Sequence, residues 1–106
     1  MRSAIAAAVA ALAAGAWAVP SLAGPVEDSM AKAGCTACHA VDKKIIGPAF
    51  KDIAAKYKGQ DVIAQLMDKV RKGGSGNWGP VPMSPNPPDK ISDTELKAAI
   101  DYILKS

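Results

Sequence analysis

The run Cys35-Thr36-Ala37-Cys38-His39 constrains the fold of this chain more than any other feature of its sequence. On a helical turn, Cys35 lies three residues before Cys38 and four before His39, so their side chains share one face. Two thiols and one imidazole are then presented together to whatever lies against that face. The rest of the chain has to be arranged around this group.

A C-x-x-C-H run is the attachment signature of c-type haem. The two cysteines can add to the two vinyl groups of a porphyrin, and His39 then lies under the iron as its proximal ligand. A structural zinc site needs four ligands, whereas residues 24–106 offer two Cys and one His. A thioredoxin-like pair needs a βαβ pattern, and a plain disulfide leaves the adjacent histidine unexplained. We therefore predict one covalently attached haem c.

Residues 1–23 are predicted to be a cleaved secretory signal peptide. Met1-Arg2 gives a short positive start, an apolar run covers 4–19, and Ser21-Leu22-Ala23 is an A-x-A-like cleavage site. The alternative is a membrane anchor, but the apolar run spans roughly 24 Å as a helix, less than the ~30 Å of hydrocarbon. We expect export to the periplasm and a mature chain of residues 24–106.

The mature chain has few large side chains from which to build a core. Four aromatic residues remain in it: Phe50, Tyr57, Trp78 and Tyr102. A domain of this size is one in which many folds need a disulfide, a metal or a cofactor. Removing Arg2 from the 13 basic residues leaves 12 against 10 acidic ones, spread along the chain, which does not favour nucleic-acid binding. We expect one domain with the haem at its middle.

Apolar spacing and capping signals predict an all-α fold. Helices are expected over 26–34, 49–58 and 61–72, with Asp61 as the N-cap of the third. The C-terminal helix is the clearest, because Ser92-Asp93-Thr94-Glu95 is a capping box. Its apolar face consists of Leu96, Ala99, Ile100, Ile103 and Leu104.

Residues 73–90 read GGSGNWGPVPMSPNPPDK and hold five of the eight prolines. Because proline lacks a backbone donor and fixes φ, this segment is not expected to be helix or central strand. Linkers rarely place residues such as Trp78, Val81 and Met83 in a solvated loop. We expect a stiff loop packed on something apolar.

The sixth iron ligand is expected to be Met83. Met67 lies on the apolar face of the third helix, and Met30 is too close to the cysteines to reach the far side of the ring. Met83 lies in the proline-rich loop, 44 residues beyond His39, and can wrap around the macrocycle. With both axial positions filled, the iron has no place for a substrate. The sequence therefore predicts a one-electron carrier and not an enzyme.

Four blocks in this order resemble a class I c-type cytochrome, in particular the small bacterial cytochrome c-551 group. They are GCTACHAVD, IIGPAFKDIAAKYKGQ, GGSGNWGPVPMSPN and the C-terminal helix. The resemblance implies an all-α cytochrome c fold of about four to five helices wrapped around one haem. One departure is visible, since the group usually has an aromatic residue in the first helix, opposite Tyr102, where this chain has Met30.

The resemblance also implies roles for four polar positions. The Pro48 carbonyl is expected to accept the Nδ1–H of His39, and the indole N–H of Trp78 to donate to a haem propionate. Asn86 is expected to hydrogen-bond near the methionine sulfur. Lys69 falls where the group often has a basic partner for a propionate.

A soluble periplasmic monomer that docks transiently at the haem edge is the function that the resemblance implies. Its partners are expected among haem-type nitrite reductases, terminal oxidases, peroxidases and a cytochrome bc complex. Two alternatives stay open: a haem-bearing subunit of a larger reductase or oxidase, and a haem enzyme or sensor if Met83 is not a stable ligand.

Overall fold

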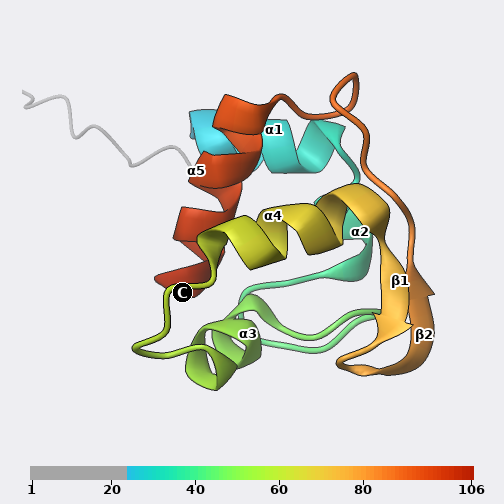
Figure 1. Ribbon diagram of the computed structural model, residues 1–106, viewed down its shortest axis with the longest axis vertical. Helices are drawn as coiled ribbons and strands as arrows, with labels where there is room; N and C mark the ends of the chain where they lie inside the picture. The colour runs from blue at the N-terminus through green and yellow to red at the C-terminus, as the bar shows by residue number, and fades with distance from the viewer. Residues whose placement is uncertain (1–23) are drawn as a thin grey trace, which may run out of the picture.

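Five helices and one hairpin make up residues 24–106, the part of the chain that the computed structural model describes (Figure 1). In chain order the elements are α1 (Pro25–Lys32), α2 (Cys35–Cys38), α3 (Phe50–Lys56), α4 (Ile63–Lys72), β1 (Gly74–Gly76), β2 (Gly79–Met83) and α5 (Asp93–Leu104). The prediction of a mainly helical chain with four to five helices is confirmed. The predicted signal peptide lies outside the described residues. Within residues 24–106, no helix has the length and apolar character needed to span a membrane.

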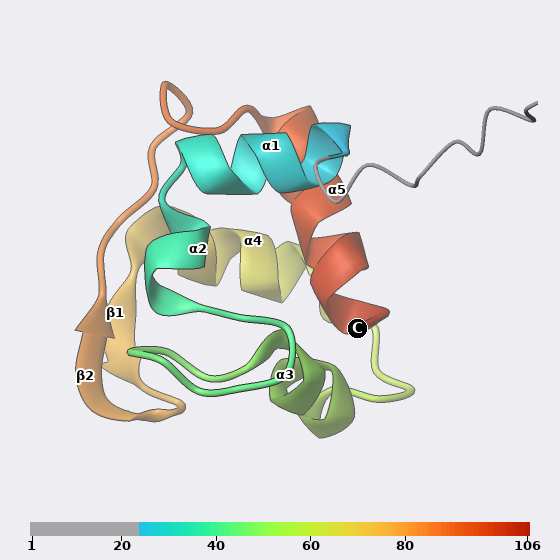
Figure 2. The same ribbon diagram turned by 180° about the vertical axis from the view of Figure 1, so that it is seen from behind.

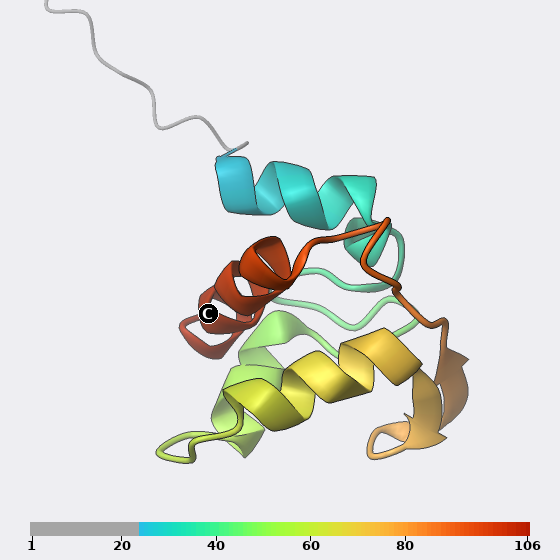
Figure 3. The ribbon, with the colours of Figure 1, turned by 45° about the horizontal axis from the view of Figure 1, so that its top comes forward.

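Helix α5 lies at the centre of the helical packing. It contacts α1, α3 and α4 (Figures 2 and 3). Its residues Leu96, Ala99 and Ile100 are buried, as the predicted apolar face requires. The remaining buried apolar residues of the core cluster are Met30, Ala33, Phe50, Tyr57, Val62, Leu66 and Ile91.

Met30 fills the α1 side of this core at the position where the resemblance expects an aromatic residue. It is only 1% exposed. Tyr102 is half-buried and meets the ring of Phe50 edge-on, with the ring centroids 6.4 Å apart. A flexible thioether side chain therefore replaces a ring beside this aromatic pair.

The capping box predicted at the start of α5 is present. The backbone N–H of Glu95 donates to Ser92 Oγ, and the backbone N–H of Ser92 donates to Glu95 Oε1, both at 3.1 Å. The hydroxyl of Ser29 lies 2.8 Å from the other carboxylate oxygen of Glu95. The cap thus also ties α1 to α5. Hydrogen bonds from Ser92, and then from Ser29, lower the pKa of Glu95 below its ordinary value.

The predicted N-cap of the third helix was wrong by one residue. Helix α4 begins at Ile63, and its N-cap is Val62, without a side-chain hydrogen bond. Asp61 is therefore not the N-cap. The apolar face predicted for this helix is correct, because Leu66 is buried and Ile63, Met67 and Val70 pack against the core.

The proline-rich segment contains a hairpin that the sequence analysis did not predict. Strands β1 and β2 are antiparallel, with Gly74 opposite Met83 and Gly76 opposite Gly79. Prolines are tolerated here because a two-stranded ribbon has an unpaired edge on each strand. Within the described residues, the chain does not cover the apolar side chains of this loop. Trp78 is 41% exposed and Val81 is 59% exposed.

Candidate functional site

The two cysteines occupy the first and last positions of α2, which is one turn long. Gly34, with φ of +86°, makes the left-handed turn that separates α2 from α1. Both Cys35 and Cys38 are free thiols and half-buried. Burial raises the pKa of the Cys35 thiol above its ordinary value. A backbone hydrogen bond partly opposes this rise, and the nearby Cys38 adds to it. The turn presents two unpaired sulfur atoms to one side of the chain.

The imidazole of His39 is held by the segment that follows it. Its Nδ1 lies 2.7 Å from the carbonyl oxygen of Pro48. A carbonyl only accepts, so this contact assigns the proton to Nδ1 and leaves Nε2 as the unprotonated nitrogen. The ring of Phe50 stacks on the imidazole at 5.5 Å between centroids, with an interplanar angle of 20°. The ring orientation and the tautomer are therefore fixed together.

Gly47 permits this close approach, a role of the glycine itself that was not predicted from the sequence. A Cβ atom added at Gly47 would lie 2.9 Å from both ring nitrogens of His39 and closer still to the carbon between them. The backbone N–H of Gly47 donates to the carbonyl of Cys38 at 2.7 Å. The loop thus folds back against the imidazole. Its position directly before Pro48 was the available signal in the sequence.

Met83 ends β2 and is half-buried. The backbone that follows it presses against Gly73, the residue after α4. A Cβ atom added at Gly73 would lie 2.9 Å from the Pro85 nitrogen and from the Ser84 carbonyl carbon, and closer still to the Met83 carbonyl oxygen. Gly73 also has φ of +68°, a left-handed conformation that favours glycine. Glycines therefore lie directly against both His39 and the Met83 segment.

Asn86 is buried, and its side chain bonds the main chain close to Met83. Its side-chain amide nitrogen donates to the carbonyls of Ser84 at 3.0 Å and Val70 at 3.2 Å. Both acceptors are main-chain oxygens. Asn86 therefore fixes the backbone next to Met83, and its hydrogen bonding near the methionine sulfur stays a prediction.

Trp78 lies at the turn of the hairpin, beneath a lysine of α3. The Nζ of Lys56 is 4.6 Å from the centre of the Trp78 ring and donates to the carbonyl of Asn77 at 3.2 Å. Lys69 is in the last turn of α4, and its Nζ lies 3.4 Å from where a Cβ of Gly74 would be. Two ammonium groups thus adjoin the hairpin. This charge suits an anionic group such as a propionate.

The predicted sulfur and nitrogen ligands come from one end of the molecule. Helix α2 and the hairpin lie together there, and α5 lies toward the other end (Figure 2). Within residues 24–106, no group of three His, Cys, Asp or Glu side chains could hold a metal ion. The donor set of two free thiols, one oriented imidazole and one thioether fits a covalently attached haem better than a protein-ligated metal.

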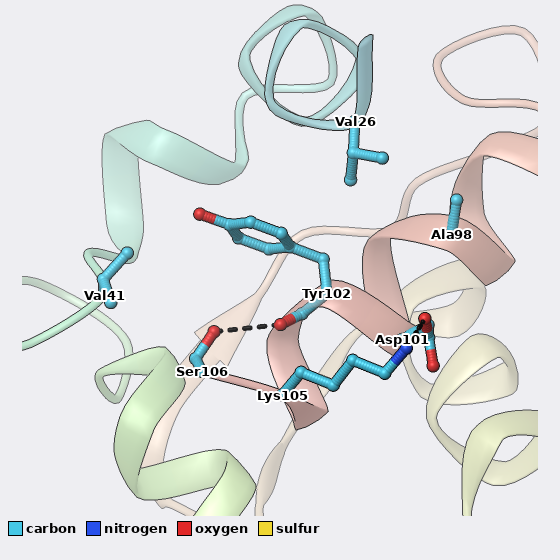
Figure 4. A pocket seen from close by; sticks show the side chains of 7 residues that line it. All are labelled: Val26, Val41, Ala98, Asp101, Tyr102, Lys105 and Ser106. Carbon is cyan, nitrogen blue, oxygen red and sulfur yellow. Dashed lines mark hydrogen bonds and ion pairs between the residues drawn. The ribbon is translucent and has the colours of Figure 1, made fainter. Parts of the chain in front are cut away.

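A separate surface hollow lies where α1 approaches the end of α5, and its residues are drawn in Figure 4. Val26, Val41 and Tyr102 give it an apolar wall. Its charged groups Lys105 and Asp101 pair with each other at 2.8 Å. None of the predicted haem-binding residues lines it, so it has no part in the candidate site.

A model of the cytochrome c family matches residues 13–106. The chain belongs to this family. It is similar to cytochrome c-551 of Azotobacter vinelandii, with 51% identity over 72 residues, which is 67% of this chain and 84% of that protein. It is also similar to cytochrome c-552 of Nitrosomonas europaea, with 49% identity over 78 residues, 73% of this chain and 74% of that protein.

The fold agrees with that of a solved relative. The crystal structure of wild-type Nitrosomonas europaea cytochrome c552 superposes with a TM-score of 0.66 at 47% identity, covering 74% of this chain and 95% of that one. As a member of the cytochrome c family, this chain carries a covalently bound haem c and is a small electron carrier. The predicted family, fold class and cofactor are confirmed.

Proposed function

We propose that this cytochrome c carries single electrons on an iron held between His39 and Met83, with the haem attached to Cys35 and Cys38. The observation that carries the proposal is the 2.7 Å contact between His39 Nδ1 and the Pro48 carbonyl. Because the proton is held on Nδ1, the other ring nitrogen is free to bind a metal. Bound haem c supplies a one-electron Fe(II)/Fe(III) couple.

Met83 supplies the second axial ligand. A thioether is a soft donor that favours Fe(II), so ligation by histidine and methionine raises the reduction potential. Gly73 and Asn86 hold the backbone that follows Met83 and so limit how far its side chain can move. With both axial positions filled, no position remains for a substrate. We therefore expect this protein to be an electron carrier without catalytic activity of its own.

The hairpin and the lysines beside it prepare a place for the haem carboxylates. The indole N–H of Trp78 donates to one propionate, and Lys56 orders the Trp78 ring from above. Lys69 supplies further positive charge beside Gly74, at the open end of the hairpin. Because these groups come from α3, α4 and the turn, the propionates also link separate parts of the fold.

The protein works in the periplasm after removal of residues 1–23, and it meets its redox partners through an apolar surface. The exposed large apolar residues of the described chain are Val41, Ile45, Ile46, Trp78 and Val81. Lys43 and Lys44 are exposed beside the first three. The small net charge gives weak steering, so such contacts belong to the small and transient class of interface.

The ligand assignment is tested by the absorption spectra of the oxidised and reduced holoprotein and by carbon monoxide binding. We expect low-spin haem c in both states, a methionine-to-iron band in the oxidised state, and no rapid carbon monoxide binding at neutral pH. Ready binding by the reduced protein would contradict the assignment of Met83. Fractionation tests the location: a free carrier is recovered from the periplasm as a monomer, whereas a subunit co-purifies with a larger complex.

A further inference from the structure

The segment between Met83 and α5 is bonded to the carboxyl-terminal end of α4. Asn86 lies three residues after Met83 and is 6% exposed. Its backbone N–H donates to the Val70 carbonyl at 3.1 Å, and its side-chain amide donates to the same carbonyl at 3.2 Å. The last turn of α4 therefore provides the acceptors that hold the chain just beyond Met83.

Arg71 binds the same segment at three points. Its Nη1 donates to the carbonyls of Ile91 at 2.7 Å and Asn86 at 3.1 Å. Its Nη2 pairs with Asp93 Oδ1 at 2.6 Å. The planar guanidinium thus spans the loop after Met83 and the first residue of α5, a geometry that one ammonium group cannot reproduce.

This arginine differs from the other paired cations of the described chain. The ion pairs Lys72–Asp68 and Lys105–Asp101 each join residues four apart on one helix, and their side chains are exposed. Such pairs contribute little to stability. The Arg71 side chain is 18% exposed and its contacts lie 15 to 22 residues away along the chain. Its loss would leave partly buried carbonyls without their charged donor.

We propose that Arg71 is the positioning residue for Met83: by binding the carbonyls of Asn86 and Ile91, it latches the loop that carries Met83 onto α4 and keeps competing ligands off the iron. This inference rests on the proposed function, because it takes Met83 as the sixth ligand. Arg71 acts through the loop and does not touch the iron. It sets how often Met83 leaves the sixth position.

Imidazole titration of the oxidised holoprotein measures this property. Imidazole can bind only while Met83 is detached, so its apparent affinity rises in proportion to the detached fraction. Arg71→Gln removes the guanidinium fork and the charge, and we expect it to raise the apparent imidazole affinity ~tenfold or more. Arg71→Lys keeps the charge but loses the fork, so its affinity falls between those of Arg71→Gln and the wild type. The Asn86 amide should also exchange faster with solvent deuterium in both variants.

Two control variants separate the latch from general destabilisation. Asp93→Asn removes an exposed ion pair and keeps both carbonyl contacts of Arg71, so imidazole affinity should change less than ~threefold. Ile100→Val lowers global stability through a buried position outside the hydrogen bonds of Arg71, and its imidazole affinity should also stay within ~threefold of the wild type. Denaturant unfolding of each holoprotein provides the stability scale.

The inference is overturned if Arg71→Gln raises imidazole affinity no more than Ile100→Val does at an equal loss of stability. If Arg71→Gln does not fold, Arg71→Lys decides, and the inference fails when its affinity does not exceed that of Asp93→Asn. A wild type that binds imidazole freely and lacks the methionine-to-iron band overturns the assignment of Met83 itself. A wild type and Arg71 variants that all resist imidazole equally overturn only the role of Arg71.

Discussion

Gly47→Ala should disturb the histidine side of the site without straining the backbone at residue 47. The added methyl group would lie 2.9 Å from both ring nitrogens of His39, too close for the imidazole to stay where it is. Moving the ring lengthens its 2.7 Å contact with the Pro48 carbonyl, since both groups are held by the same short loop. The substitution therefore perturbs the orientation of the ligand and the acceptor that fixes its tautomer.

The expected cost combines overpacking and a weakened hydrogen bond. Overpacking costs about 1–3 kcal/mol, and a neutral hydrogen bond contributes about 1 kcal/mol. A total of about 2–4 kcal/mol corresponds to a fall in Tm of roughly 10–30 °C for a domain of this size. The oxidised spectrum and the reduction potential should change as well, because the acceptor behind a ligating histidine tunes its basicity.

Gly59→Ala is the matched control. Gly59 has φ of +75° and nothing within 4 Å of an added Cβ, so alanine there costs backbone strain and no collision. The strain is about 1–2 kcal/mol, which lowers Tm by roughly 5–15 °C and leaves the haem spectrum unchanged. The comparison uses thermal unfolding, absorption spectra and redox titration of both holoproteins. A Gly47→Ala protein with wild-type spectrum and potential would refute the argument that this glycine positions His39.

Four further predictions concern the ligands and the cap of α5. Met83→Ala should keep the haem attached, open the reduced protein to carbon monoxide and lower the potential; unchanged carbon monoxide binding would refute Met83 as a ligand. Cys35→Ala combined with Cys38→Ala should abolish covalent haem and leave the chain largely unfolded, as circular dichroism would report; a well-folded double variant would contradict the haem-centred core. Because hydrogen bonds lower the pKa of Glu95, its stabilising effect is complete above the ordinary glutamate pKa and is lost as the pH falls through the lower folded value. The free energy of unfolding should therefore fall more between neutral and acidic pH in the wild type than in Glu95→Gln, which lacks the titrating carboxyl group. Ser92→Ala should lower the free energy of unfolding by about 1 kcal/mol in denaturant unfolding at neutral pH.

The helices could be predicted from the sequence because their signals are local. The capping box of Ser92 and Glu95 needs two residues three apart, and the apolar face of α5 repeats along one helix. The start of α4 was misplaced since Asp61 is a good capping residue by type, yet the helix begins after Val62, whose side chain is buried in the core. At this helix start, the burial of Val62 outweighed the capping preference of Asp61.

The hairpin was missed because its residues do not carry the local signals of a strand. Strand signals are alternating apolar and β-branched residues, whereas β1 is Gly74-Ser75-Gly76 and β2 contains Pro80 and Pro82. Its pairing depends on glycine conformations: Gly74, Gly76 and Gly79 all have positive φ. Single-residue propensity cannot predict such a ribbon, since its residue types favour turns.

The supports of the site were harder to predict than the ligands. Residue type and spacing were enough to predict ligand roles for the C-x-x-C-H run and for Met83, and these roles stay predictions. The roles of Gly73 and Arg71 depend on which backbone atoms lie opposite them. Those atoms are set by how the loop after Met83 crosses α4, which the local sequence does not show. Asn86 was identified, but its carbonyl partners were not, because residue type alone does not say which acceptor lies across from an amide nitrogen.

The two proposed axial ligands are therefore held by different means, with consequences for how the site opens. His39 is bonded to Pro48, nine residues away, and it adjoins the covalently attached turn of α2. Met83 depends on contacts that join α4, the following loop and the start of α5, with Arg71 reaching as far as Asp93. Local contacts survive partial unfolding that separates distant elements. Any opening of the α4–α5 packing should therefore release Met83 while His39 stays oriented, which confines exchange at the iron to one axial position.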